Sequence, residues 1–178
     1  MPITCKYNSD ITLEKKIYNF KQLLAIQSFI LLARPKDIVY KSEVAKKIFI
    51  QDLNSIIERG LLIAEIPYVD NTNWLDLMSD VRSKFPYLQL GSASLINKKS
   101  IDDSLKLDLN FSMMRTWDKD LYIYSKKNNY LLIPGMKTIK DLKEAIFHKC
   151  CTIKIFPVAK KDILLDINKY NQISFVGA

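Results

Sequence analysis

One lysine interrupts the otherwise apolar segment CTIKIFPVA, which covers residues 151–159. Successive side chains of a strand point to opposite faces, so Lys154 points away from the isoleucines on either side of it. Its own face carries Thr152 and Phe156 rather than the several polar residues of a solvated strand. The pattern predicts a half-buried amine, which costs free energy unless it is paired or does chemistry.

A carboxylate occupies a similar position in LLIAEIPYV, residues 61–69, where Glu65 follows four apolar residues. Desolvation would lower the pKa of Lys154 and leave more neutral amine to attack a carbonyl, while Glu65 could move protons as the adduct forms and breaks down. These are the requirements of Schiff-base catalysis. A buried Lys–Glu ion pair without activity explains the same two residues, and spacing alone leaves both interpretations open.

Short apolar runs recur along the chain and alternate with amphipathic stretches. The runs cover residues 26–34, 61–69, 88–94, 109–116, 130–136, 151–159 and 173–177. Continuous apolar strands that are each followed by a helix are typical of a parallel sheet covered on both faces, either doubly wound or closed into a barrel. The second and sixth strands of a barrel contribute to the same interior layer, so Glu65 and Lys154 are expected to meet inside it.

Helical spacing is clearest in residues 42–60, where Val44, Ile48, Leu53 and Ile56 recur and Gly60 follows as a C-terminal cap. Residues 73–85 and 138–149 have the same character, with Thr138 as an N-cap. The segment LEKKIYNFKQLLAI predicts a further helix before the first strand. We expect one domain over residues 1–178, with residues 1–25 as an N-terminal helical extension.

The composition fits a folded chain of 178 residues, with 48% hydrophobic and 26% charged residues. A net charge of +8 is spread over scattered lysine doublets, which favours solvated helix faces over nucleic-acid binding. No apolar run approaches the roughly 18 residues of a membrane span, and three cysteines with two adjacent favour reduced thiols, so we expect a cytoplasmic protein. Only four glycines occur, which excludes a glycine-rich phosphate cradle.

Other polar residues stand where strands end. Arg34 and Arg115 could bind an anionic substrate or simply reach solvent, and Ser94 closes the third run. The only histidine, His148, falls in the last turn of an expected helix, where it suits the helix dipole better than catalysis. Two tryptophans, Trp74 and Trp117, start expected helices and are interpreted as packing residues.

Five short motifs resemble, in order and separation, those of the class I aldolases that cleave 2-keto-3-deoxy-6-phosphogluconate (KDPG) and 4-hydroxy-2-oxoglutarate (KHG). They are LLAR, AEIP, GSAS, LIPGMKTIKD and IKIFP, and the resemblance extends from about residue 28 to 178. It implies a TIM-type (β/α) barrel that is C-terminally incomplete, with about seven parallel strands and an N-terminal helix. It also implies a metal-independent carbon–carbon lyase of carbohydrate metabolism that needs no cofactor.

By this resemblance Lys154 is the Schiff-base lysine and Glu65 the proton-transfer carboxylate. The motifs that contain Arg34, Ser94, Pro134 and Phe156 match the family's substrate-binding positions. The expected partner is a small keto acid with a pyruvate moiety, and neither nucleic acid nor a membrane. Family members that resemble this chain form trimers, so a homo-oligomer is expected.

The sequence also departs from the family pattern. Val69 stands where the family has a carboxylate-binding arginine, Met114 and Arg115 replace a Ser/Thr-Pro pair, and the glycine pair after the lysine strand is absent. Two hypotheses therefore remain. The chain is either a pyruvate-releasing aldolase or an inactive aldolase-like barrel that serves as a binding or interaction module.

Overall fold

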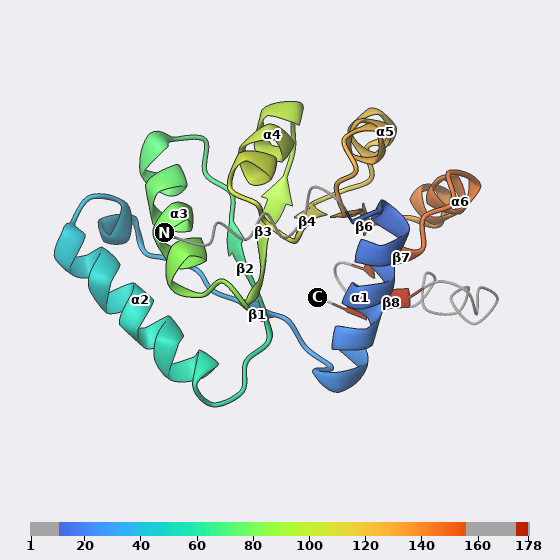
Figure 1. Cartoon of the computed structure of the whole chain (residues 1–178). Coiled ribbons are helices and arrows are strands. Elements are labelled where there is room, and N and C mark those ends of the chain that lie inside the picture. The colour runs from blue at the N-terminus through green and yellow to red at the C-terminus, as the bar shows by residue number, and fades with distance from the viewer. Residues whose placement is uncertain (1–10, 156–173, 178) are drawn as a thin grey trace.

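The computed structural model describes residues 11–155 and 174–177. Strands and helices alternate regularly along the chain, as Figure 1 shows. The strands are β1 (Leu31–Leu32), β2 (Ile63–Pro67), β3 (Gln89–Leu95), β4 (Phe111–Met114), β5 (Leu132–Ile133), β6 (Gly135–Met136), β7 (Thr152–Ile155) and β8 (Ser174–Gly177). The helices are α1 (Leu13–Ile26), η1 (Asp37–Tyr40), α2 (Glu43–Ile57), α3 (Thr72–Lys84), α4 (Lys98–Lys106), α5 (Lys119–Lys127) and α6 (Ile139–Phe147).

All strand pairings are parallel, and spatial neighbours are also neighbours in sequence. One sheet has the order β1-β2-β3-β4-β5 and the other the order β6-β7-β8. β5 and β6 are separated only by Pro134, which has no backbone N–H to donate, so together they count as one interrupted strand. The prediction of about seven parallel strands is confirmed, and the sequential order excludes the reversal that defines a doubly wound sheet.

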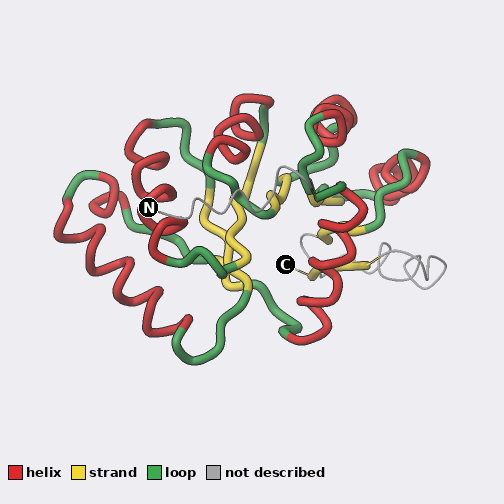
Figure 2. Tube along the Cα trace, in the orientation of Figure 1, coloured by secondary structure: helices red, strands yellow, loops and turns green. Residues whose placement is uncertain are grey.

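The strands curve inside an arc of helices, as Figure 2 shows, with α2 to α6 following one another along the outside. This arrangement is an incomplete barrel in the described residues, since no pairing between β1 and β8 joins the two outer edges there. Two hydrophobic clusters lie between the strands and the outer helices. A third lies inside the ring, where Phe20 of α1 packs against Ile63, Phe111 and Ile133. α1 therefore closes one end of the barrel.

The N-terminal helix is confirmed, because α1 covers the same fourteen residues that the pattern indicated. Residues 1–10 of the expected extension lie outside the described residues. Each outer helix starts with a side-chain N-cap, and Thr138 forms a full capping box with Asp141. Since these helices follow strands, their capped ends lie at the same end of the barrel as the carboxyl ends of the strands.

Burial on α2 and the extent of the first strand could not be taken from the sequence pattern. The buried side chains of α2 are Ile50 and Leu53, whereas Val44, Ile48 and Ile56 are 69%, 52% and 41% exposed. Helical spacing alone fits two adjacent faces of this helix, and only packing against α3 and η1 selects one of them. The first apolar run is the second case, because residues 26–34 contribute the end of α1 and a connecting segment before the two-residue β1.

Candidate active site

Alternation along β2 directs Glu65 into the barrel. Ala64 and Ile66 belong to the cluster beneath the outer helices, while Ile63 belongs to the cluster inside the ring. Glu65 shares the face of Ile63 and is only 6% exposed. Its register partners are Leu32 on β1 and Gly91 on β3, so neighbouring strands on both sides fix its position.

The same alternation in β7 directs Lys154 inward. Ile153 and Ile155 are fully buried against the outer helices, and Lys154 between them is half-buried. Its backbone N–H donates to the carbonyl of Pro134 at 2.9 Å, and its register partner is Gly135. The interrupted strand β5/β6 thus holds the backbone of Lys154 in place, because the Pro134 carbonyl accepts this hydrogen bond.

The side chains of Glu65 and Lys154 line one cavity of about 690 Å³. Its lining residues are Leu24, Ser28, Phe29, Ile30, Leu32, Arg34, Glu65, Ala93, Ser94, Met113, Arg115, Lys154 and Val176. Glu65 is the middle residue of β2 and Lys154 the third of four residues in β7. Arg34 and Arg115 follow β1 and β4, at the end of a parallel barrel where catalytic groups converge. The apolar members come from inside the barrel, from Leu24 near the end of α1, and from the segment between α1 and β1.

The carboxylate of Glu65 is held in an unfavourable environment. Its Oε2 atom is buried and accepts no hydrogen bond from the described residues. Burial raises the pKa of Glu65, and the positive charges of Lys154 and Arg34 oppose that rise only in part. A raised pKa makes the ionised carboxyl group a better proton acceptor, and a carboxyl group that accepts a proton can also return it, as a proton shuttle must.

The amine of Lys154 is perturbed in the complementary direction. Burial lowers its pKa, the Glu65 carboxylate opposes this, and the positive charges of Arg34 and Arg115 lower it further. No direct ion pair between Lys154 and Glu65 occurs among the described residues. The two groups therefore face the same space without a closed ion pair between them, which leaves the amine accessible to a ligand.

The structure brings most of the sequence-predicted positions together. Arg34 and Ser94 line the cavity beside Glu65 and Lys154, and Ser94 has a φ of 63°. This left-handed conformation lies near the end of β3, where the register with β4 shifts between Ser92 and Leu95. Pro134 is buried behind Lys154 and contributes its carbonyl rather than a cavity wall. Phe156 lies outside the described residues.

Residues that the sequence marked as unrelated to catalysis lie away from the cavity. His148 is the C-cap of α6, and its ring centroid is 5.9 Å from that of Trp117. Trp74 is fully buried at the start of α3 and donates from Nε1 to the Pro67 carbonyl at 2.8 Å. Both tryptophans thus have packing roles.

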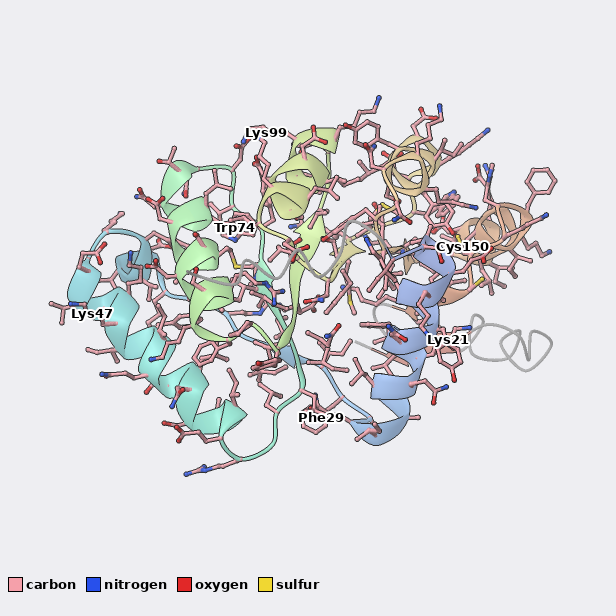
Figure 3. All side chains as sticks on the ribbon, viewed as in Figure 1. Lys21, Phe29, Lys47, Trp74, Lys99 and Cys150 are labelled. Atoms are coloured by element: carbon pink, nitrogen blue, oxygen red, sulfur yellow. The ribbon has the colours of Figure 1, made fainter. Side chains whose placement is uncertain are left out.

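Sequence reasoning missed the wall formed by the connection between α1 and β1. Ser28, Phe29 and Ile30 line the cavity, and Figure 3 shows Phe29 near the turn that follows α1. The hydrophobic run FILLA suggested a strand throughout, so its first residues were not considered as site residues. No periodic pattern distinguishes a connecting segment that contacts a cavity from the strand that follows it.

The loop after β2 is fixed to α4 by a polar cluster. Tyr68 donates from its hydroxyl to Asp103 at 2.9 Å, and Lys99 donates to Asp103 at 3.1 Å and also pairs with Asp70. Val69 lies between the two anchored loop residues, is 36% exposed, and does not line the cavity. The loop after β2 therefore supplies no positive charge to the site.

No group of three or more His, Cys, Asp or Glu side chains that could hold a metal ion occurs within residues 11–155 and 174–177. The chemistry of the described site is that of an amine, a carboxyl group and two guanidinium groups. Among the same residues, no helix is long and apolar enough to cross a membrane.

The described residues define an α/β protein with an incomplete parallel barrel. No protein-family model matches the sequence, and no curated protein matches it. Among solved structures, the KDPG aldolase from Legionella pneumophila, with pyruvate captured as a covalent carbinolamine, is 18% identical with a TM-score of 0.70. The match covers 84% of this chain and 70% of that one.

Two further solved structures agree with this result. The 2-keto-3-deoxy-6-phosphogluconate aldolase from Zymomonas mobilis is 16% identical with a TM-score of 0.69, over 84% of this chain and 69% of that one. A porous cage designed by fusing symmetric oligomeric domains is 13% identical with a TM-score of 0.67, over 83% of this chain and 53% of that one. The chain therefore has the fold of the KDPG aldolases, at a sequence identity that is low throughout.

Proposed function

We propose that this protein is a class I aldolase that cleaves a 2-keto-3-deoxy or 4-hydroxy-2-keto acid into pyruvate and an aldehyde. The observation that carries the proposal is the shared cavity, into which a half-buried lysine of lowered pKa and a buried carboxyl group of raised pKa open without pairing directly. The fold of the KDPG aldolases supports it independently.

The proposed reaction begins when the neutral amine of Lys154 attacks the 2-keto carbon and forms a carbinolamine, which loses water to give an iminium ion. Glu65 provides the proton for the departing water. A base then removes the proton of the C4 hydroxyl, the C3–C4 bond breaks, and its electron pair moves into the iminium to form an enamine. The aldehyde leaves, the enamine is protonated at C3, and hydrolysis releases pyruvate and restores the amine.

The direct test is reduction with borohydride in the presence of pyruvate, followed by peptide mass mapping. We expect one label, on Lys154, because lowered pKa and cavity access distinguish this lysine from the exposed ones. Lys154→Ala should abolish the label and the matched variant Lys47→Ala should retain it, since Lys47 is exposed on α2 and lies on the outer rim in Figure 3. Labelling spread over surface lysines would contradict the proposal.

A binding or interaction module without turnover is the second candidate. It is favoured by Val69, which provides no charge at a position where the sequence resemblance implies an arginine. This candidate predicts that keto acids bind in the cavity while incubation with them yields no pyruvate. Release of pyruvate, followed with a coupled lactate dehydrogenase assay, would eliminate it.

We also propose that the protein acts as a homo-oligomer, with a trimer as the expected assembly, in the cytoplasm. Large apolar side chains near the end of α1 and the start of β2 are exposed, with Ile26 at 73%, Phe29 at 63% and Leu62 at 36%. Such a patch is more typical of a subunit interface than of a monomer surface. Light scattering over a wide concentration range tests the assembly, and a constant monomer mass would contradict it.

A further inference from the structure

Positive charge exceeds negative charge in the cavity. Arg34, Arg115 and Lys154 face it together with one carboxylate, Glu65. Within the described residues, none of these four side chains forms an ion pair or a side-chain hydrogen bond. Charged groups that share a partly apolar space usually neutralise one another, so this unpaired surplus favours an anionic ligand.

The two arginines enter the cavity from different sides. Arg34 follows β1, whereas Arg115 follows β4, with β2 and β3 between the two strands. Arg34 therefore stands next to the strand of Glu65. Arg115 belongs to the side of the ring that continues through β5/β6 to Lys154 on β7.

Gly135 links the backbone positions of Arg115 and Lys154. A Cβ atom at Gly135 would lie 2.7 Å from the carbonyl oxygens of both Met114 and Arg115, so only glycine allows the end of β4 to approach β6 this closely. The same residue is the register partner of Lys154. One glycine thus holds the start of the Arg115 side chain close to the strand that carries the amine.

Both guanidinium charges lower the pKa of Lys154, and Arg34 does so more than Arg115. Arg34 also acts on Glu65, whereas Arg115 acts on Lys154 and not on Glu65. A 2-keto acid bonded to Lys154 through C2 has its carboxylate one bond away, at C1. A cation on the Lys154 side of the cavity is the group in position to bind that carboxylate.

We propose that Arg115 is the residue that binds the C1 carboxylate of the keto acid, and that it sets the preference for 2-keto acids over uncharged carbonyl compounds. The inference rests on the proposed Schiff-base function and deepens it. Nothing in the loop after β2 competes for this role, because Val69 lies outside the cavity and Asp70 pairs with Lys99. The substrate class is therefore defined by a guanidinium from β4.

The test compares pyruvate with pyruvamide, which has the same keto group but no negative charge. The readout is the concentration that gives half-maximal borohydride trapping at Lys154. Arg115→Gln should raise this concentration about 10- to 100-fold for pyruvate, the loss expected for a charge-assisted hydrogen bond. For pyruvamide the same concentration should change less than about threefold, because pyruvamide has no carboxylate for Arg115 to bind. A change in the reactivity of Lys154 itself would affect both compounds equally.

Arg115→Lys keeps the charge without the planar fork, and we expect it to restore part of the pyruvate preference. Lys47→Gln removes one positive charge from the exposed surface of α2 and should leave both values unchanged. Equal losses for pyruvate and pyruvamide in Arg115→Gln would overturn the proposal, since they would indicate a general structural effect. An unchanged value for pyruvate would overturn it as well.

A second measurement separates this proposal from the Schiff-base function. Calorimetric titration of Lys154→Met with pyruvate measures non-covalent binding, and Arg115→Gln in that background should weaken it about tenfold or more. If the wild type traps no pyruvate but this dependence holds, the aldolase function fails and the carboxylate site stands. If trapping succeeds and the dissociation constant does not depend on Arg115, or no binding is measurable in Lys154→Met, the Arg115 proposal fails.

Discussion

Glu65→Gln should make the protein more stable and less active at neutral pH. Glu65 is 6% exposed, and its Oε2 atom has no hydrogen-bond partner among the described residues. Burial raises its pKa in the folded state, and the nearby positive charges only partly oppose this. Ionisation of Glu65 therefore costs folding free energy, and a neutral side chain of the same shape avoids that cost.

The sign of the pH dependence follows from the raised pKa. An acid whose folded-state pKa lies above its unfolded value contributes most to stability below the unfolded pKa, and this contribution is lost as pH rises through the folded pKa. Wild type should thus lose stability relative to Glu65→Gln between pH 4 and pH 7.5. We expect the variant to gain on the order of 1 kcal/mol at the higher pH, the lower end of the cost of an unsatisfied buried acceptor, because its amide stays buried.

Urea denaturation followed by tryptophan fluorescence measures this difference. With a urea m-value of about 1–3 kcal/mol/M, a gain of about 1 kcal/mol moves the midpoint by roughly 0.3–1 M. Turnover in the same variant should fall about 100- to 10,000-fold, the usual contribution of a proton-transfer group. The matched control is Asp52→Asn on the exposed surface of α2, where Asp52 forms no side-chain interaction with the described residues.

Two results would refute the reasoning about Glu65. A variant less stable than wild type at pH 7.5 would mean that the carboxylate is stabilised by its positive neighbours more than burial destabilises it. A gain of the same size at pH 4 and pH 7.5 would mean that ionisation is not its cause. The first outcome would favour the buried ion pair over an open catalytic pair.

Two further predictions test the electrostatics and the packing of the barrel. Trapping of pyruvate should reach its plateau at a lower pH than an ordinary lysine would allow, because the pKa of Lys154 is lowered. Glu65 raises this pKa and Arg115 lowers it, so Glu65→Gln should move the pH profile to lower pH and Arg115→Gln should move it to higher pH. Gly91→Ala should destabilise the protein by about 1–3 kcal/mol, because the new methyl group would lie 2.5 Å from the Phe111 ring. In a double-mutant cycle of urea midpoints, Phe111→Leu should reduce that loss. A pH profile insensitive to both substitutions, or additive losses in the cycle, would contradict these expectations.

Local patterns determined the elements and their order. Apolar runs of strand length separated by amphipathic segments predicted the alternation, and α1 and the Thr138 cap of α6 appear where the sequence indicated them. These features depend on residues that are close in sequence, so short-range periodicity and capping chemistry suffice to predict them. The isolated Lys154 and Glu65 were visible for the same reason, since each breaks the apolar character of its own strand.

Tertiary structure alone decided how the charged groups relate to one another. The sequence could not show that Lys154 and Glu65 lack a direct ion pair, that Arg115 enters their cavity, or that the segment before β1 forms one of its walls. It also could not select the buried face of α2. The physical reason is that these properties depend on distances between strands that are far apart in the chain. Sheet order, register and the close contact at Gly135 set those distances. Periodicity in the sequence indicates only the face of its own strand or helix on which each side chain lies.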